Sequence, residues 1–376
     1  MHAMARLLSV PLLEKKPLTS SRSRFGDFLA VLLLLAILAG LGWLWLQQKH
    51  PKSRAHKISS VNSLATATSP LPVEKPKPKP LVIPPQSVTD FPRPVRDVFE
   101  AQVALARRGI SPGSLDAAIG SQTRAAIAAF QHSQKLSESS TLDTNTRAML
   151  LLDAPMLADY TVTTNDLARL QPIGKTWLEK SQQSALDYET ILELVAEHAH
   201  SHPLLIQKLN PAVNWTNVAA GTVLKIPDVN YPESSDKAAF VVIHLAQKFL
   251  EAFDVQTNLM LHCPCSIAAK VEKRPVGELH VAVVAPDPNY TFDPAVFPES
   301  PEAQVIGHKL ILPPGPNNPV GLAWIGLDKP GYGMHGTPVP EQVGRTESHG
   351  CFRLANWDAQ FLVNVVWVGM PVTVVP

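Results

Sequence analysis

A histidine and a cysteine in the last fifty residues have the types and the spacing of a nucleophile with its base. His335 belongs to Met334-His335-Gly336-Thr337, and Cys351 follows sixteen positions later in the run Ser348-His349-Gly350-Cys351-Phe352-Arg353-Leu354. A cysteine is an effective nucleophile as its thiolate, and a neighbouring imidazole can take the thiol proton and return it to a leaving amine. Gly336 and Gly350 allow close backbone approach, and Gly350 lets the Cys351 amide turn toward a developing oxyanion. The pattern predicts acyl transfer through a thiol.

Two other interpretations of these residues are a metal site, since two histidines and a cysteine form a ligand set, and a buried structural cysteine. Zinc sites usually draw on a local Cys-x-x-Cys or His-x-x-x-His pair, and neither spacing occurs in this segment. We therefore expect no metal and no organic cofactor.

The segment as a whole resembles the catalytic motif of the L,D-transpeptidase (YkuD) family of peptidoglycan enzymes. The resemblance rests on His-Gly-Thr, on Gly-x-x-x-Ser-His-Gly-Cys-x-Arg-Leu and on Asn356-x-Asp358. It extends to Arg274-Pro275-Val276-Gly277, where the family usually has Thr-Pro-Thr-Gly, so hydroxyls are lost but the Pro and Gly that shape the turn remain. The resemblance implies a mainly-β, YkuD-type sandwich with the cysteine beside a groove.

The resemblance also implies roles for individual residues. Cys351 would attack the carbonyl of the third residue of a peptidoglycan tetrapeptide stem, release the terminal D-alanine and pass the acyl group to an amine. His335 would be the general base, and His349 would orient the site. Arg353 would bind a substrate carboxylate or brace the catalytic loop, and bracing is favoured. Oxyanion donation or support of the site would come from Gly350, Ser348, Gly336 and Asn356.

Two alternative functions stay open on the sequence. Water could resolve the same thioester, which would make the protein an L,D-carboxypeptidase or an amidase that releases wall-linked protein. A non-catalytic wall-binding scaffold is the other alternative, and the presence of His335, His349 and Cys351 argues against it.

The N-terminal part predicts a membrane anchor. Residues 28–46 form an uncharged run of nineteen, just long enough to cross a bilayer, with Trp43 and Trp45 at its distal end. No small-residue cleavage site follows, which favours an uncleaved single-pass signal anchor after a cytoplasmic segment, 1–27. Residues 47–94 are rich in Pro, Lys and Ser and predict an extended linker. Basic residues flank both sides of the span, so the enzyme resemblance decides the orientation, with the C-terminal domains in the periplasm or cell wall space.

Residues 95–155 predict a small all-α domain. Apolar residues recur at helical spacing on either side of a break at Gly109 and Pro112-Gly113, which predicts two helices and a turn, with Thr123 as a helix start. The region resembles the helical peptidoglycan-binding domain, although Asp116-Ala117 stands where that family usually has Asp-Gly. A helical packing module without glycan affinity is the alternative.

Residues 156–235 predict a small α+β module. Short β-like runs at Tyr160–Thr163 and 220–227 enclose two helical stretches, and the order and the Gly-x-x-Leu-x-Ile-Pro ending resemble a LysM glycan-binding module. The stretch 165–188 is unusually long for that family, so a degenerate packing element is the alternative. His198, His200 and His202 alternate at a helix end, where solvated histidines are a simpler interpretation than a metal site.

Residues 236–376 predict the catalytic domain. Strands are expected at 240–244, 249–253, 259–262, 279–284 and 372–375, and a helix at 357–366. Of the three cysteines, Cys263 and Cys265 are the close pair, and a strained, reducible disulfide and two buried thiols are equally compatible with the spacing. The net charge is only +1, and the sequence has no phosphate-binding glycine loop. The sequence therefore gives no indication of a nucleic-acid partner. The expected partners are stem peptides and glycan, with the cytoplasmic membrane bound through 28–46.

Overall fold

The computed structural model describes residues 91–297, 300–348 and 350–376. The predicted segments 1–27 and 28–46, most of the linker 47–94, and His349 lie outside the described residues. Within the described ranges, no helix combines the length and the apolar character needed to cross a membrane.

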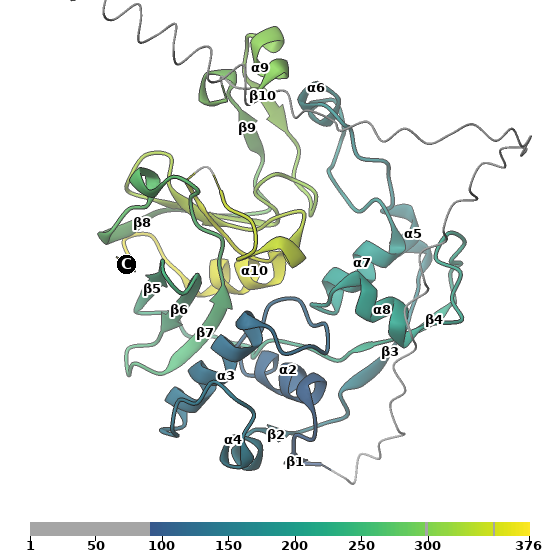
Figure 1. The fold of residues 1–376 in the computed structure, drawn as a ribbon. Helices are drawn as coiled ribbons and strands as arrows, with labels where there is room; N and C mark the ends of the chain where they lie inside the picture. Colours follow the sequence, from purple (N-terminus) through teal and green to yellow (C-terminus); the bar gives the residue numbers. More distant parts are fainter. Residues whose placement is uncertain (1–90, 298–299, 349) are drawn as a thin grey trace, which may run out of the picture. The chain divides into compact units, whose positions relative to one another are not determined.

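The first region is helical, as expected, but it has three helices rather than two. They are α2 (Val98–Ala106), α3 (Ser121–Ser133) and α4 (Thr144–Met149) (Figure 1). The short strand β1 (Arg93–Pro94) pairs antiparallel with β2 (Leu151–Leu152), which places the last two predicted linker residues in this fold. Side chains of α2 and α3 share one buried core with Leu150 and Leu152, which directly follow α4.

Thr123 does not start α3, which corrects the sequence prediction. The helix begins two residues earlier, after Gly120, and has no side-chain cap. Thr123 is buried, and its hydroxyl accepts a hydrogen bond from Nε2 of Gln102 at 3.1 Å. The amide of Gln102 also binds the turn before α3, so Thr123 helps to tie α2 to that turn.

The turn at Asp116-Ala117 explains the residue preference of the resembled family. Ala117 has a φ of 61°, in the left-handed region where a Cβ is unfavourable and glycine is not. The turn is nevertheless formed, because Oε1 of Gln102 accepts from the Ala117 amide at 2.9 Å and Oδ1 of Asp116 accepts from the Ala118 amide at 2.8 Å.

The second region is α+β, as predicted, but four helices rather than two lie between its two strands. Strand β3 (Leu157–Thr161) pairs antiparallel with β4 (Val223–Pro227), and α7 (Ile191–His198) and α8 (Pro203–Leu209) lie between them in sequence. The long stretch before α7 contains α5 (Thr164–Ala168) and α6 (Trp177–Ser181), each begun by a capping box. These two helices were not predicted.

The third region is mainly β, as predicted. Five of its strands overlap the five predicted segments, and the others were not predicted. The eight-stranded sheet has the order β13-β12-β11-β8-β14-β5-β6-β7. Its strands are β5 (Phe240–His244), β6 (Phe249–Phe253), β7 (Leu259–Pro264), β8 (Gly277–Pro286), β11 (Ala323–Leu327), β12 (Gly333–His335), β13 (Phe352–Arg353) and β14 (Pro371–Val375).

The expected sandwich is formed by one continuous sheet rather than by two separate sheets. The long strand β8 pairs through 277–280 with β14 and through 281–286 with β11, so it belongs to both halves. Buried side chains from both halves and from helix α10 (Asn356–Val365) form a single core. The sharing of β8 keeps the two halves in one register, and the active-site strands β12 and β13 lie at one end of the strand order.

A hairpin that the sequence did not predict projects from this sheet. Strands β9 (Tyr290–Phe292) and β10 (Leu310–Leu312) pair antiparallel, and α9 (Pro301–Ile306) lies between them in sequence (Figure 1). Trp177 of α6 stacks on Phe292 of β9, with ring centroids 4.5 Å apart. The unpredicted helix α6 therefore packs on the unpredicted hairpin.

Two further sequence questions are settled by burial. Cys263 and Cys265 are free, fully buried thiols, so the structure has the second of the two alternatives for this pair. His200 is not a solvated histidine: its ring stacks on Trp357 at 5.1 Å, and burial lowers the pKa of His200 to about 3. His202 caps α8 by accepting from the Leu204 amide, and only His198 is exposed.

Candidate active site

Two parallel neighbouring strands present the histidine and the cysteine. In the pairing of β12 with β13, Met334 lies opposite Phe352 and His335 opposite Arg353. Met334 and Phe352 belong to the buried core, so the alternate positions face away from it. Cys351 directly precedes β13 and shares this outer face with His335 and Arg353. The local alternation of the strands therefore brings the thiol and the imidazole to one side of the sheet.

Cys351 is a half-buried, neutral thiol. Its Sγ donates to the carbonyl oxygen of Gly331 at 3.5 Å. Burial raises the pKa of Cys351 to about 11, and a hydrogen bond with the backbone of Gly333 opposes that rise only in part. A protein base is therefore needed to generate the thiolate near neutral pH.

His335 is held in the tautomer of a base. Its side chain is 6% exposed, and Nδ1 lies 2.7 Å from the carbonyl oxygen of Gly336. A carbonyl can only accept, so Nδ1 carries the proton and the lone pair is on Nε2. Burial lowers the pKa of His335 to about 4; the Gly336 hydrogen bond raises it and the charge of Arg353 lowers it further. The imidazole is thus neutral and basic at Nε2 near neutral pH.

The loop between the two strands is braced by its own side chains. Oγ of Ser348 donates to the carbonyl of Cys351 at 2.5 Å and accepts from the Gly350 amide at 3.3 Å. Nη2 of Arg353 donates to Oγ1 of Thr346 at 3.0 Å and to the carbonyl of Glu347 at 2.6 Å. Arg353 is thus placed as a brace, and the Gly350 amide is occupied by Ser348, so donation by that amide to an oxyanion would require this bond to open.

Asn356 is fully buried behind the His335 loop. Its Oδ1 accepts from the amides of Thr337 at 3.0 Å and Leu322 at 3.3 Å. A Cβ on Gly336 would lie 2.2 Å from this oxygen, and a Cβ on Gly321 would lie 2.0 Å from it. The glycine after the histidine is therefore required by the close approach of the Asn356 amide.

The sequence analysis did not identify three residues near the site. Trp324 on β11 stacks on His335 with centroids 5.6 Å apart. Burial and, to a smaller extent, Cys351 raise the pKa of Tyr290 to about 12. Glu197 on α7 binds Asn356. The sequence held one sign of this role: Glu197 places a carboxylate on the apolar face of the helix that includes Leu194 and Val195.

In the part of the chain that the structure describes, no group of three or more His, Cys, Asp or Glu side chains is arranged to hold a metal ion. His349, the remaining predicted site residue, lies outside it.

A thiol and an Nε2-basic imidazole on one face of a mainly-β domain are the groups that a cysteine-dependent enzyme would use. Residues 238–374 match the L,D-transpeptidase catalytic domain family, and residues 95–150 match the putative peptidoglycan binding domain family. Residues 238–374 thus carry the L,D-transpeptidase catalytic domain, and residues 95–150 carry the putative peptidoglycan binding domain.

Curated relatives carry the same family name. The chain is 26% identical over 188 residues to the "Putative L,D-transpeptidase YkuD" of Bacillus licheniformis, covering 50% of this chain and 94% of the relative. It is 30% identical over 167 residues to the "Probable L,D-transpeptidase YbiS" of Escherichia coli K12, covering 44% of this chain and 53% of the relative. The chain thus spans nearly all of the first relative and about half of the second. The solved L,D-transpeptidase 3 from Mycobacterium tuberculosis aligns over 43% of this chain and 77% of its own, at 18% identity and a TM-score of 0.30.

Proposed function

We propose that this protein transfers the acyl group of a peptidoglycan tetrapeptide stem to an amine acceptor through a thioester on Cys351. The observation that carries the proposal is the tautomer of His335, whose Nδ1 is committed to Gly336 while Nε2 is left basic on the face of the sheet that carries Cys351. The family name supports the choice of substrate. Either a stem peptide or a protein could supply the acceptor amine.

The reaction balances with the residues present. The Sγ proton moves from Cys351 to Nε2 of His335 as Sγ bonds to the carbonyl carbon of the third stem residue. The C–N bond to the terminal D-alanine breaks, and His335 returns the proton to the departing amine. The acceptor amine then attacks the thioester and gives a proton to His335, which passes it to the departing thiolate. His349 would orient the site, and no metal or organic cofactor enters any step.

The neutral resting pair is compatible with this sequence of proton transfers. With the pKa of His335 lowered to about 4 and that of Cys351 raised to about 11, mainly by burial, both groups are uncharged over a wide range of pH. Ionisation of the thiol would then accompany attack, when Sγ leaves the Gly331 carbonyl and substrate excludes water.

The rest of the chain would hold this site against the cell wall. Residues 28–46 would anchor it in the cytoplasmic membrane as a single pass, and residues 47–94 would extend from the membrane toward the wall in the periplasm or cell wall space. The helical domain, supported by its family match, and the LysM-like module, in which the first and last strands pair, would bind glycan.

The test is mass spectrometry of the products formed from purified disaccharide-tetrapeptide by the protein and by its Cys351→Ala variant. A cross-linked dimer that lacks one D-alanine, absent with the variant, is the expected product. A shortened monomer alone would replace the proposal with hydrolysis. Turnover by the variant would remove Cys351 from the mechanism.

A further inference from the structure

The second module contacts the catalytic domain behind the His335 loop. Helix α7 carries Glu197, whose Oε1 and Oε2 accept from Nδ2 of Asn356 at 3.1 and 3.0 Å. Both side chains are buried, with Asn356 inaccessible and Glu197 9% exposed. Glu197 lies outside residues 238–374, the part of the chain that matches the catalytic family.

This contact fixes which way the Asn356 amide faces. The carboxylate can only accept when ionised, so it selects the Nδ2 end of the amide, and the Oδ1 end is left for the amides of Thr337 and Leu322. A flipped amide would bring Nδ2 against two backbone donors and its oxygen against the carboxylate. The carbonyl of Pro316 also accepts from Nδ2, at 3.3 Å, so Glu197 is the charged one of two acceptors that favour the orientation in which Asn356 supports the loop that carries His335.

Glu197 is itself held in place. The hydroxyl of Tyr188 donates to its Oε1 at 3.2 Å. Burial raises the pKa of Glu197 to about 7, while the hydrogen bonds from Asn356 and Tyr188 oppose the rise. Burying this carboxyl group costs free energy of desolvation. A smaller apolar residue at position 197 would pack in the helix core without that cost.

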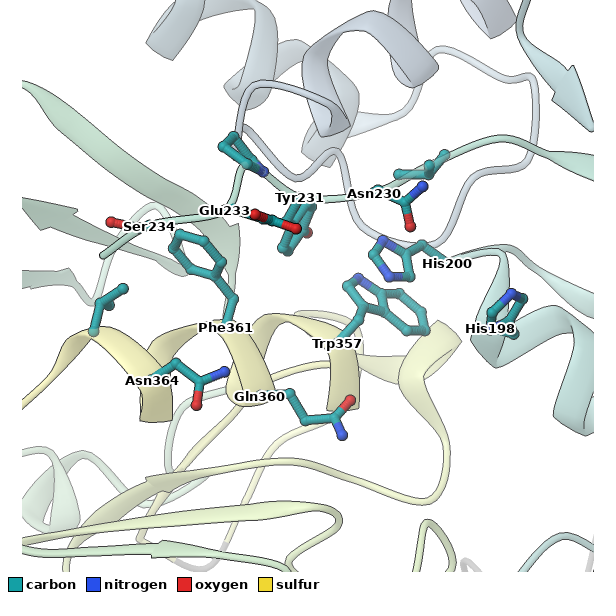
Figure 2. A pocket seen from close by; sticks show the side chains of 13 residues that line it. His198, His200, Asn230, Tyr231, Glu233, Ser234, Trp357, Gln360, Phe361 and Asn364 are labelled. Atoms are coloured by element: carbon teal, nitrogen blue, oxygen red, sulfur yellow. The ribbon is translucent and has the colours of Figure 1, made fainter. Parts of the chain in front are cut away.

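The other side of the same junction is packed by aromatic rings. Figure 2 shows Trp357, which follows Asn356 on α10, lying face to face with His200 from the segment after α7, beside Tyr231 and Phe361. These rings line a cavity of about 490 Å³. Hydrogen bonds on one side and ring contacts on the other hold the first turn of α10 against the second module.

We propose that Glu197 is a positioning residue of the catalytic domain, supplied by the accessory module, which holds the His335-Gly336-Thr337 loop in its working geometry through Asn356. This inference rests on the proposed function for its kinetic consequence. It means that the second module completes the active site, whether or not the module also binds glycan.

The helix provides a matched control in Glu193, one turn before Glu197. Its Oε1 accepts from Nδ2 of Asn317 at 2.6 Å, so it too binds an asparagine of the catalytic domain. Nδ2 of Asn317 also donates to the carbonyl of Asp187, and Asn317 makes no described hydrogen bond to the His335 loop. Loss of Glu193 weakens the junction without removing support from the loop.

The experiment compares the full chain with its Glu197→Ala, Glu197→Gln and Glu193→Ala variants below their melting temperatures. Two readouts are used: kcat and KM on disaccharide-tetrapeptide, and the rate at which iodoacetamide alkylates Cys351 as a function of pH. Cys263 and Cys265 are buried, and a Cys351→Ala variant sets the background of the alkylation.

We expect Glu197→Ala to lower kcat and the neutral-pH alkylation rate about 10- to 100-fold at similar KM, as small misplacements of catalytic groups do. Glu197→Gln should recover most of the loss, because its amide oxygen still accepts from Asn356.

A reciprocal pair of substitutions gives a second test. Asn356→Asp alone would place its carboxylate against that of Glu197, and the two would repel each other. When Asn356→Asp is combined with Glu197→Gln, the glutamine amide can donate to the new carboxylate. Faster alkylation and turnover in the double variant than in Asn356→Asp would support the proposal, and no gain would overturn it.

The outcomes separate this proposal from the proposed function. If the wild type fails to use the tetrapeptide but Glu197→Ala still slows alkylation selectively, the substrate assignment fails and the positioning role of Glu197 stands. Equal losses in Glu193→Ala and Glu197→Ala, or a melting temperature lowered with both readouts unchanged, would reduce Glu197 to a structural contact and overturn the proposal.

Discussion

At the scale of single residues, the site depends on close backbone approaches that only glycine permits. Gly336 admits Oδ1 of Asn356 to the backbone after His335, at a distance where a Cβ would lie 2.2 Å from that oxygen. The glycine that follows the histidine in the motif is therefore required by the packing of Asn356 against the backbone.

Gly336→Ala is predicted to abolish most of the activity. The added methyl group must displace the Asn356 amide or the loop, and a shift of that size costs roughly 100-fold in rate. Steady-state kinetics on the tetrapeptide substrate would show it. Gly120→Ala is the control, since no atom lies within 4 Å of its Cβ position and its φ is −89°. Equal activity of the two variants would contradict the role assigned to Asn356.

Ala117→Gly is predicted to stabilise the helical domain. The left-handed φ of 61° at Ala117 strains an alanine, and glycine removes roughly 1 kcal/mol of that strain. Chemical denaturation would report the gain in the free energy of unfolding. Ala118→Gly, at the next position of the turn and without a positive φ, should instead be neutral or destabilising. A loss of stability in Ala117→Gly would show that the turn does not store this strain.

At the scale of secondary-structure elements, the hairpin β9–β10 is held by the second module. Trp177 of α6 stacks on Phe292 and lies 6.0 Å from the ring of Tyr290, the tyrosine whose pKa is raised by burial and by Cys351. The backbone amide of Trp177 also donates to Oε2 of Glu302 at 2.8 Å. The stretch 165–188, which is longer than in the resembled module, thereby holds the hairpin in place.

Trp177→Ala is predicted to loosen this hairpin. Loss of the stacked ring, worth roughly 1 kcal/mol beyond the area that it buries, should speed hydrogen exchange in β9 and β10 and raise KM several-fold. Hydrogen exchange measured by mass spectrometry, with steady-state kinetics, would test both effects. Leu178→Ala is the matched control, because the Leu178 side chain is 45% exposed on the same helix. Unchanged exchange in β9 and β10 would contradict the proposed contact.

The sequence predicted those elements whose signals are local. Phe240–His244 and Phe249–Phe253 are apolar runs bounded by turns, and both strands match their predicted limits. Hairpin β9–β10 was missed because its three-residue strands are too short to show a period. Helices α5 and α6 were missed although Thr163 and Thr176 each begin a capping box, a signal that was present in the sequence. Local motifs also located Cys351 and His335, whereas the contact of Glu197 with Asn356 joins residues 159 positions apart and has no local sign.

At the scale of the whole described chain, the first turn of α10 is where the three regions meet. Asp358 accepts from the hydroxyl of Tyr231 and, at 3.2 Å, from Oγ of Ser111 in the helical region, while Asn356 binds Glu197 of the second module. Asp358 is 1% exposed, and burial raises its pKa to about 7, opposed by these two hydrogen bonds. The junction therefore contains a buried carboxyl that folding favours in its protonated form.

Asp358 should make the stability of the protein fall as pH rises. Its pKa is raised from 3.8 to about 7, so the stability that it contributes is fully present below pH 3.8 and is lost as pH rises through 7. At about 1.4 kcal/mol per pKa unit, the loss is at most roughly 4 kcal/mol. Denaturation between pH 4 and pH 8 should show a smaller decline in Asp358→Asn than in the wild type. The exposed Asp236→Asn is the control, and a parallel decline in all three proteins would contradict the assignment.

The central claim, a thioester on Cys351, is tested most directly by the intact mass of the protein after incubation with disaccharide-tetrapeptide and no added acceptor. The account predicts an added mass equal to the substrate minus D-alanine, on the peptide that contains Cys351 and absent from Cys351→Ala. The same adduct in Cys351→Ala, or release of D-alanine by that variant, would contradict it.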